Sequence, residues 1–522
     1  MRWIVIGGIV ALAFVGASML ATYGYGRFAE RARGEPSYAL DRGGSQTPLD
    51  ERIASLTAGK GAGNGLVMLS SNLDAFAARA LSARAAHRSL DLMYYIWNDD
   101  LTGQLLMRET IAAAERGVRV RLLLDDIGVS GFDKAFLALA SHPNIELRLF
   151  NPTRARENVL RRGLEMALRA FSVTRRMHNK AWIVDGRVAI VGGRNIGDEY
   201  FDAAEASNFR DLDLLAVGPV VRQTEHVFDD YWNSGLALPI AALTSRTAPA
   251  AAELQSRLQE PASSEGARPY IDRLREHVSL DALLGPGAIH WSEKVELVSD
   301  PPEKALGERG KNWLMEKLLP VMTSATNDLE ITSPYFIPGE EGVRQLTELA
   351  QAGVSVSILT NSLSATDVAA VHGGYAPYRE PLLAGGAQLF ELKREGADAD
   401  LSLRGSSQAS LHTKAFTVDD RIGFIGSLNL DPRSVSLNTE MGVLFEVPKL
   451  VETMRVLFRD QTSPGYSYKV LLDANGSLLA CGGGRSTVDL QQRAGHQSRA
   501  SPDRPDRRLP TPRIATLSWE RR

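Results

Sequence analysis

Two segments of the chain repeat the same reactive side chains at the same spacing. In each, a lysine follows a histidine by two residues and an aspartate follows the lysine by five, with a glycine-containing turn and an asparagine further on. Residues i and i+2 of a strand project from the same face, so each histidine and its lysine are expected to point together. The first set is His178, Lys180, Asp185, Gly192, Gly193 and Asn195; the second is His412, Lys414, Asp419, Gly426, Ser427 and Asn429.

These residue types suit attack on a phosphodiester. Neutral imidazole is a competent nucleophile near pH 7 because its unperturbed pKa is about 6.5. A second, protonated imidazole can donate a proton to the leaving alkoxide. Two lysines can neutralise the phosphate oxygens, and Asn195, Asn429 and the backbone amides of the glycine turns can complete a phosphate-binding cradle. The residues supply the positive charge themselves, so this chemistry needs no metal ion and no other cofactor.

A β-hairpin is expected to position each set. The apolar run after each histidine predicts a buried strand, and a second apolar run follows a short turn. Such a hairpin would bring Asn195 and Asn429 back beside the histidines and lysines. We count Asp185 and Asp419 with the catalytic motifs and expect them to pin the turns rather than touch substrate. The turns are predicted at 185–187 and 419–421, and the second strands at 188–191 and 422–425.

The elements before the two motifs also repeat, which indicates an internal duplication. Leu90 and Leu329 are offset by 239 residues, Gly117 and Gly353 by 236, and the two histidines by 234. A nearly constant offset of this length means two copies of one domain. Strands alternate with helices, so we expect an α/β fold of two fused domains with mixed β-sheets flanked by helices. Strands are predicted at 89–97, 118–124, 144–150, 328–336, 354–360 and 387–392, and helices at 74–86, 101–115 and 342–352.

The length of 522 residues also favours two domains over one core. The single cysteine, Cys481, leaves no disulfide within the chain. The expected division is 1–26, a membrane anchor or signal; 27–65, a linker with a short helix near 49–56; 66–235, the first domain; 236–290, a bridging segment; 291–480, the second domain; and 481–522, a disordered basic tail.

The N-terminus predicts a membrane anchor. No charged residue occurs from Trp3 to Gly26, and about 24 helical residues span roughly 36 Å, enough to cross a bilayer core. A cleaved signal peptide is the alternative. Arginines lie on both sides of the run, so the orientation stays open. The formal net charge of −3 lacks the basic excess typical of nucleic-acid-binding proteins, so no nucleic-acid partner is expected.

Both motifs resemble the H-x-K-x4-D-x6-G-S-x-N signature of the phospholipase D superfamily. The second matches in full, whereas the first has Gly193 in place of serine, which we expect to remove a hydroxyl donor to phosphate. Residues 66 to 470 are similar to bacterial cardiolipin synthases and their phospholipase D-like relatives. The closer likeness lies in YYIWNDD (94–100), GRNIGDEY (193–200), SPYFIP (333–338) and NLDPRS (429–434).

The resemblance implies that the two motifs meet at one site across a pseudo-twofold interface. It implies that His178 is the nucleophile, forming a phosphohistidine, and that His412 acts as acid and then as base. A downstream carboxylate would orient each ring: Asp211, with Asp213 as the alternative, and Glu440. Tyr94, Tyr95, Trp97, Tyr335 and Phe336 are expected in the core rather than at a lipid entrance; Tyr200 and Phe201 border the site or pack inside; Arg433 binds a headgroup or forms an ion pair; and His372 is a weaker candidate for the acceptor site.

The resemblance further implies a phosphatidyltransferase, cardiolipin synthase-like, at a bacterial inner membrane. Its substrates would be phospholipids, with phosphatidylglycerol first and phosphatidylethanolamine as a possible second. Two alternatives stay open: a phospholipase D that transfers the same group to water and releases phosphatidic acid, and a nuclease of the same superfamily.

Overall fold

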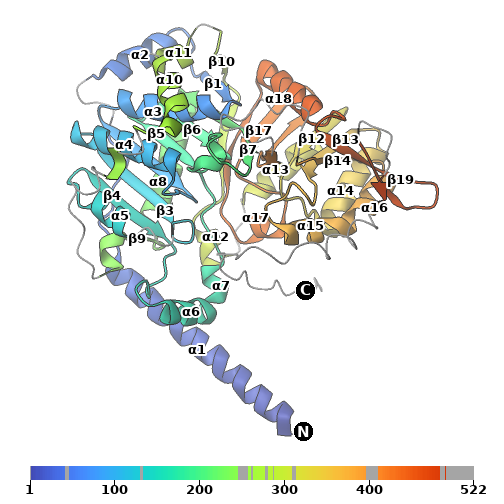
Figure 1. Ribbon diagram of the computed structural model, residues 1–522, viewed down its shortest axis with the longest axis horizontal. Helices are drawn as coiled ribbons and strands as arrows, with labels where there is room; N and C mark the ends of the chain where they lie inside the picture. The colour runs from blue at the N-terminus through green and yellow to red at the C-terminus, as the bar shows by residue number, and fades with distance from the viewer. Residues whose placement is uncertain are drawn as a thin grey trace.

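A computed structural model describes most of the chain as two α/β halves preceded by a long N-terminal helix (Figure 1). The described residues are 2–41, 46–129, 133–244, 257–259, 263–276, 280–285, 287–308, 313–394, 409–482 and 488–489. The predicted basic tail therefore lies almost wholly outside the described residues.

Each half is built on one mixed sheet, and within the described residues the two sheets share the same strand order. The first runs β10-β1-β8-β6-β5-β2-β3-β4-β9, and the second runs β11-β18-β17-β16-β12-β13-β14-β19-β20-β21. The eight strands from β1 to β9 in the first order correspond one by one to those from β11 to β19 in the second. The matching strand order is structural evidence for the internal duplication.

The strands of the first sheet are β1 (Asn64–Leu69), β2 (Ser89–Tyr94), β3 (Arg119–Asp125), β4 (Ile145–Phe150), β5 (Ala181–Val184), β6 (Val188–Gly192), β8 (Asp213–Val217), β9 (Ala237–Pro239) and β10 (His290–Ser292). Those of the second are β11 (Val295–Ser299), β12 (Asp328–Thr332), β13 (Ser355–Asn361), β14 (Gln388–Leu392), β16 (Ala415–Val418), β17 (Ile422–Gly426), β18 (Met441–Phe445), β19 (Ser467–Leu472), β20 (Leu478–Cys481) and β21 (Val488–Asp489). The parallel strands β2–β3–β4 and β12–β13–β14 include every strand predicted ahead of the two motifs.

Helices cover the sheets. Those of the first half are α3 (Asn72–Ala85), α4 (Leu101–Glu115), α5 (Asp133–Ala140), α6 (Val159–Leu168), α7 (Ala170–Val173), α8 (Pro219–Trp232), α10 (Arg268–Glu276) and α11 (Leu280–Leu283), with η1 (Asp198–Tyr200), η2 (Ile240–Ala242) and η3 (Glu265–Ala267). Those of the second are α12 (Glu303–Leu306), α13 (Leu314–Thr323), α14 (Gly339–Gln351), α15 (Ala369–Tyr375), α16 (Arg379–Ala384), α17 (Pro432–Ser436) and α18 (Pro448–Gln461), with η4 (Ala376–Tyr378).

The helix-to-strand turns explain why the repeat was visible in the sequence. Helix α4 begins after Asp100, whose carboxylate accepts the backbone N–H of Gly103, and it ends before Gly117. Gly117 has φ of +94° and its counterpart Gly353 has +96°, a backbone conformation that only glycine adopts without strain. Equivalent glycines therefore follow the helix that precedes the second parallel strand in each half.

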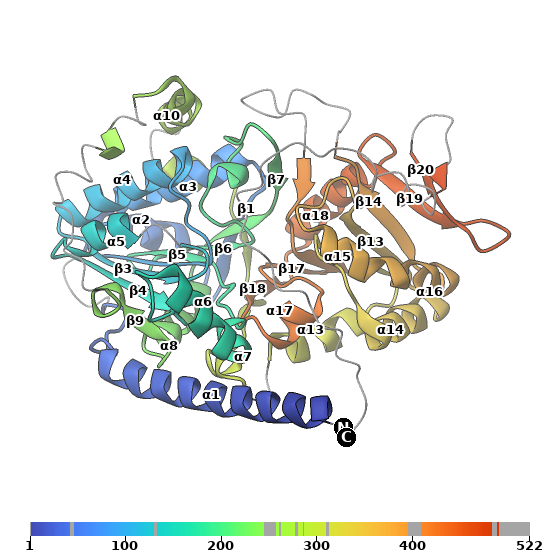
Figure 2. The ribbon, with the colours of Figure 1, turned by 60° about the horizontal axis from the view of Figure 1, so that its bottom comes forward.

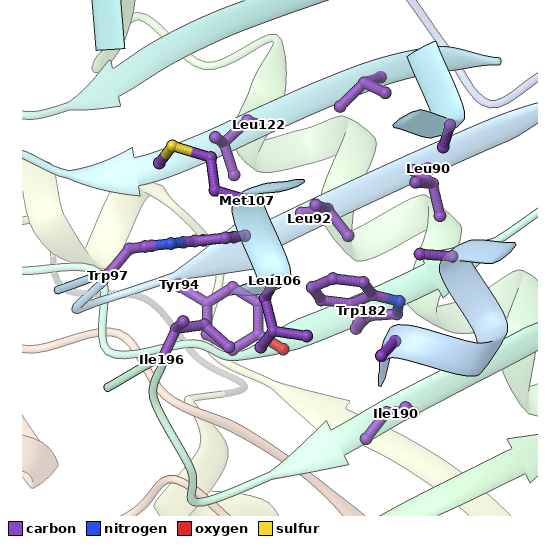
Figure 3. Close-up of a cluster of buried hydrophobic side chains, with 14 of the residues drawn as sticks. Leu90, Leu92, Tyr94, Trp97, Leu106, Met107, Leu122, Trp182, Ile190 and Ile196 are labelled. Carbon is purple, nitrogen blue, oxygen red and sulfur yellow. The ribbon is translucent and has the colours of Figure 1, made fainter. Parts of the chain in front are cut away.

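The hydrophobic interior has three large parts. One lies under the outer helices of the first sheet and contains Tyr94, Trp97 and Trp182, which pack together with surrounding leucines (Figure 3). A second lies within the second half. A third joins the halves, because it combines side chains of both sheets with those of α8 and α18. The two motif strands β5 and β16 both contribute to this shared core.

Helix α1 (Arg2–Ala32) extends the predicted anchor by six residues, and α2 (Pro48–Thr57) matches the short helix expected in the linker. The segment 236–290 does more than bridge the halves. It adds β9 to one edge of the first sheet, while α10 and α11 pack on α3. Strand β10, at the other edge, straddles the predicted boundary, since His290 falls in the expected bridging segment and Trp291 and Ser292 in the expected second domain. Sequence composition could not show this, because strands as short as three residues carry no periodicity.

Candidate active site

The two motifs meet because the halves exchange backbone contacts at reciprocal positions. The backbone N–H of His178 donates to the carbonyl of Thr439, and that of His412 donates to the carbonyl of Arg210, each at 2.9 Å. Short parallel pairings run beside these bonds: Met177 with Thr439, and β15 (Ala409–Leu411) with β7 (Asn208–Arg210). Each histidine is thereby fixed next to the segment that ends in the other half's acidic residue.

The carboxylates are consequently crossed between the halves. Nδ1 of His178 lies 2.8 Å from Oε2 of Glu440, and Nδ1 of His412 lies 2.5 Å from Oδ2 of Asp211. Both residues proposed from the sequence as orienting acids do contact a histidine. The pairing differs from the sequence interpretation, in which each acid lay downstream of its own histidine. With Nδ1 of each ring engaged, Nε2 is the nitrogen left for chemistry.

The serine of the second motif contacts the carboxylate. The hydroxyl of Ser427 donates to Oε2 of Glu440 at 2.5 Å, and its carbonyl lies 3.1 Å from Nδ1 of His178. This corrects the expectation that this hydroxyl is a donor to phosphate. Gly193 occupies the equivalent place in the first half, where a Cβ would lie 2.2 Å from Oδ1 of Asp211. Serine is absent there because the carboxylate of Asp211 fills the space.

The two lysines are buried beside the histidines. Each ammonium group donates to the backbone carbonyl of the histidine two residues before it, at 2.5 Å for Lys180. Burial lowers the pKa of Lys180 to about 7 and that of Lys414 to about 8, although Glu440 and Asp211 partly oppose the effect. Two cations held without water are a strong attraction for an anionic group.

The pKa values of the two histidines are shifted by burial and by the charges of the neighbouring lysines and carboxylates. Burial lowers the pKa of His178, with Glu440 opposing it. Burial lowers the pKa of His412 well below its usual value, and the charges of Lys414, Lys180 and His178 add to this. The carboxylates differ: His178 and Lys180 hold the pKa of Glu440 down against its burial, whereas burial raises that of Asp211. The coupling of all these groups indicates one composite site.

The side chains of the two motif asparagines, Asn195 and Asn429, differ in their hydrogen bonds. The side chain of Asn195 accepts from the N–H of Ile96 at 3.2 Å and donates to the hydroxyl of Tyr200 at 2.8 Å. Asn429 is also buried, but its side-chain oxygen has no hydrogen-bond partner among the described residues. The side-chain oxygen of Asn429 is therefore available to accept a hydrogen bond from a donor group of a ligand.

Aromatic rings surround the two imidazoles. Tyr95 packs edge-on against His178 at 5.1 Å between ring centroids, and Tyr200 packs edge-on against His412 at 5.2 Å. Phe209 lies 4.8 Å from His412. Tyr94 and Trp97 are in the core as predicted, but Tyr95 is not, since its ring borders the site. Tyr200 borders the site, whereas Phe201 is fully buried against Phe76.

The motif aspartates lie at the far ends of the motif strands. Asp185 accepts the backbone N–H groups of His87, Arg88 and Ser89, and Asp419 accepts those of Thr326, Asn327 and Asp328. Both have positive φ, at 51° and 50°. They join the hairpin turn to the start of the neighbouring strand, β2 or β12, as expected of residues that pin the turns.

The other sequence candidates have structural partners. Asp213 forms an ion pair with Arg79 at 2.9 Å, which leaves Asp211 as the histidine's carboxylate. His372 contacts Arg379, and Arg433 donates to the carbonyl of Thr174 at 3.1 Å. Phe336 is in the core, whereas the hydroxyl of Tyr335 contacts Asp367 at 2.7 Å.

Sequence reasoning missed a support behind Glu440. Asp300 accepts the backbone N–H of Glu440 at 3.0 Å and the ammonium of Lys304 at 2.8 Å. It also accepts the N–H of Leu314 at 2.8 Å. No signal near Asp300 could have found it, because its partners come from three separate places along the chain.

Comparisons with known proteins identify the family of the chain. The family described as "Cardiolipin synthase, PLD-like domain" matches residues 82–232 and 318–461. The chain is 43% identical to cardiolipin synthase C of Escherichia coli K12 over 397 residues, 74% of this chain and 82% of that one. It is 32% identical to an uncharacterised protein of Helicobacter pylori over 426 residues, 78% of this chain and 82% of that one.

A solved structure shares the fold. The crystal structure of phosphatidylserine synthase from Haemophilus influenzae Rd KW20 matches with a TM-score of 0.55 at 15% identity, covering 86% of this chain and 97% of that chain. At that identity the likeness concerns the fold alone. Both halves carry a family match, and the relative from E. coli matches across them. The chain therefore belongs to the phospholipase D superfamily, in the family of cardiolipin synthase, PLD-like domains.

Proposed function

We propose that the chain is a phosphatidyltransferase that forms cardiolipin from phosphatidylglycerol through a phosphohistidine intermediate. The observation that carries the proposal is the crossed arrangement of two histidine–carboxylate pairs around two buried lysines. The 43% identity to cardiolipin synthase C supports the choice of substrate.

In the first half-reaction, Nε2 of His178 attacks phosphorus and the P–O bond to the leaving alcohol breaks. His412, protonated at Nε2, gives its proton to the departing alkoxide. Lys180 and Lys414 neutralise the non-bridging oxygens, and the side-chain oxygen of Asn429 accepts a hydrogen bond from a hydroxyl group of the substrate. The alcohol leaves, and the phosphatidyl group stays on His178.

In the second half-reaction, neutral His412 takes a proton from the acceptor alcohol. The acceptor oxygen forms a new P–O bond as the P–N bond to His178 breaks. A glycerol hydroxyl of phosphatidylglycerol gives cardiolipin, phosphatidylethanolamine can serve as an alternative donor, and water gives phosphatidic acid.

The carboxylate Glu440 supports His178 as the nucleophile. A ring that gains phosphorus while Nδ1–H remains in place becomes cationic, and an ionised carboxylate at Nδ1 stabilises that charge. Glu440 suits this task because its pKa is held down. The pKa of His412 is lowered well below its usual value by burial and by neighbouring positive charges, and the negative charge of a bound phosphodiester would raise it again, which suits its role as the acid.

We also infer that α1 anchors the chain in the bacterial cell membrane and that the reciprocal contacts follow a pseudo-twofold axis. Among the described residues, α1 is the one helix long and apolar enough to cross a membrane by length and composition, and its most apolar 18-residue stretch has a mean hydropathy of 2.4. Resistance of the protein to carbonate extraction, lost when residues 2–26 are deleted, would test the anchor.

The product spectrum tests the function. Purified protein is incubated with phosphatidylglycerol, alone and with phosphatidylethanolamine, and the lipids are analysed by mass spectrometry beside His178→Ala. Cardiolipin that disappears in the variant is the expected result. Phosphatidic acid alone would make the protein a hydrolase, and cleavage of plasmid DNA without lipid turnover would make it a nuclease.

A further inference from the structure

Helix α6 has its apolar side turned outward. Val159 and Leu160 are each 84% exposed and Leu164 is 61% exposed, and none of the residues of α6 is buried. Phe171, in the short helix α7 that follows, is 84% exposed. Water-exposed helices of globular proteins show the reverse, with the apolar stripe against the core. A contiguous apolar surface of this kind marks an interaction site.

The polar side of α6 faces the protein. Glu165 accepts the backbone N–H groups of Arg154 at 3.0 Å and Ala155 at 2.8 Å, and it pairs with Arg169 at 2.7 Å. Arg162 lies 3.4 Å from the fully buried Asp126. These contacts fix the rotation of α6 about its axis, and this rotation directs the apolar side chains away from the protein.

The same segment lies against the anchor helix. The guanidinium of Arg169 is 3.2 Å from the ring centroid of Tyr25, and that of Arg154 is 4.8 Å from the ring of Phe28, both near the inner end of α1. Both overall views place α6 and α7 beside α1, on the side of the body from which α1 extends (Figures 1 and 2). A bilayer crossed by α1 would meet α6 and α7.

We propose that α6 and α7 form a membrane-facing surface that lies in the interface of an anionic bilayer. The apolar side chains Val159, Leu160, Leu164 and Phe171 would enter the acyl region. Exposed Arg161 and the arginines in the last turns of α1 (Arg27 and Arg31) would meet lipid phosphates. The charge favours a lipid surface, since apolar side chains edged by arginine suit an anionic interface.

This surface leads directly to the reactive centre. Phe171 precedes His178 by seven residues, and Arg433, which follows the second motif, donates to the carbonyl of Thr174 between them. A short stretch of chain, which the second half also contacts, therefore joins the membrane-facing surface to His178. The inference concerns membrane contact and does not depend on which lipid reaction the site performs.

The test measures depth in the full-length protein. In a Cys481→Ser background, Leu164→Cys carries an environment-sensitive NBD label, and the protein is reconstituted into vesicles of equal parts phosphatidylglycerol and phosphatidylcholine. Val456→Cys on α18, 48% exposed and far from α1, is the matched control. Helix α1 anchors both proteins equally, so only the local depth differs.

The label at position 164 is expected to shift its emission to the blue and to lose at least about half its intensity to lipids carrying a quencher in the acyl chain. The label at position 456 should do neither. The double variant Leu160→Asp, Leu164→Asp with the label on Phe171→Cys should abolish the quenching while circular dichroism stays native, because the replaced side chains are exposed.

Two results would overturn the proposal. They are a label at position 164 that lipid quenchers do not reach and equal quenching at positions 164 and 456. A label at position 164 that is shifted to the blue but not quenched by lipid would assign the surface to a second copy of the chain or to a protein partner. Loss of lipid turnover alone would affect the proposed function and leave this inference intact.

Discussion

The two halves of the molecule share a strand order, yet their histidine–carboxylate pairs are not equivalent. His178 faces a glutamate that also accepts the hydroxyl of Ser427, and the pKa of that carboxyl is held down. His412 faces an aspartate packed against Gly193, and burial raises the pKa of that carboxyl. One fold repeated twice thus presents an ionised and a less readily ionised acid to two otherwise similar rings.

The duplication has preserved the contact between histidine and carboxylate in both pairs, whereas the electrostatic surroundings of the two pairs have diverged. A negative charge at Glu440 stabilises a cationic ring at His178, which suits the ring that bonds to phosphorus. A ring with a strongly lowered pKa, as at His412, is a strong proton donor once it has taken a proton from solvent, and the charge of a bound phosphodiester favours that protonated form. The residues that distinguish the two pairs are few. Ser427 stands where the first half has Gly193, and Glu440 has one methylene group more than Asp211.

The largest test of the comparison removes each histidine in turn. With a phosphatidyl p-nitrophenol substrate, whose leaving group needs no proton, His178→Ala is expected to lose about 10⁴-fold or more in rate and to show no burst of nitrophenol. His412→Ala should keep the burst and accumulate a phosphatidyl adduct on His178, read by peptide mass mapping. An adduct on His412 in the His178→Ala protein would reverse the assignment.

The carboxylates come next. Glu440→Gln is expected to lower kcat/KM by about 10³-fold, and Asp211→Asn by about 10²-fold, because the amide removes a charge that counts more where the acid is ionised. Steady-state kinetics on vesicles measures both. Equal losses would mean that the two pairs carry the same charge during turnover, against the difference in pKa direction.

Exchanging the small residues isolates the local cause. Gly193→Ala is expected to cost about 10²-fold, because its Cβ would fall 2.2 Å from Oδ1 of Asp211. Ser427→Ala should cost about tenfold, the value of one hydrogen bond to a charged group. Gly163→Ala, where a Cβ meets nothing within 4 Å, is the matched control. A Ser427→Ala protein with normal kcat would remove the hydroxyl from the comparison.

The lysines predict the basic side of the pH profile. Their pKa values of about 7 and about 8 mean that the charges are present below this range and are lost as pH rises through it. We therefore expect kcat/KM to fall from about pH 7 upward, and kcat to fall only at higher pH because bound phosphate raises both values. Lys449→Met, at an exposed position, should leave the profile unchanged. A flat profile beyond about pH 9 would contradict the lowered values.

The smallest effect on chemistry is expected at the motif aspartates. Asp185→Asn should reduce the free energy of unfolding by about 2–3 kcal/mol and Asp419→Asn by about 1 kcal/mol, since the first is the more buried and both lose acceptors for backbone N–H groups. Thermal unfolding measures the loss, and kcat of the folded fraction should change less than about threefold. A large fall in kcat at full stability would return them to the catalytic set.

Much of the fold was predictable because it repeats. The helix at 101–115 was placed to the residue, and the strands on either side within a few, since Asp100 and Gly117 mark the ends of α4. The hairpins that carry the motifs were also predictable, each from two apolar runs separated by a short turn. What the sequence hid depends on the association of the halves. Neither the contact of His178 with Glu440 nor the burial of Asp300 leaves a local pattern.

Two further errors have physical reasons. Tyr95 was expected in the core with its neighbours, but the strand ends at Tyr94, so the alternation that would bury it no longer applies. The serine of the second motif was assigned to phosphate by analogy, whereas its hydroxyl lies beside Glu440. For Tyr95 the residue at which the strand ends decides what the side chain contacts, and for Ser427 the side-chain rotamer does. Sequence composition carries no information about either.

The crossed pairing also constrains how such a chain could evolve. A protein made of one half would need two identical copies to complete either pair, and every substitution would then appear at both. Joining the halves in one polypeptide releases that constraint, because position 193 can become glycine while position 427 remains serine. Fusion allows a symmetrical pair of reactive rings to specialise, so that one ancestral residue can acquire two separate duties.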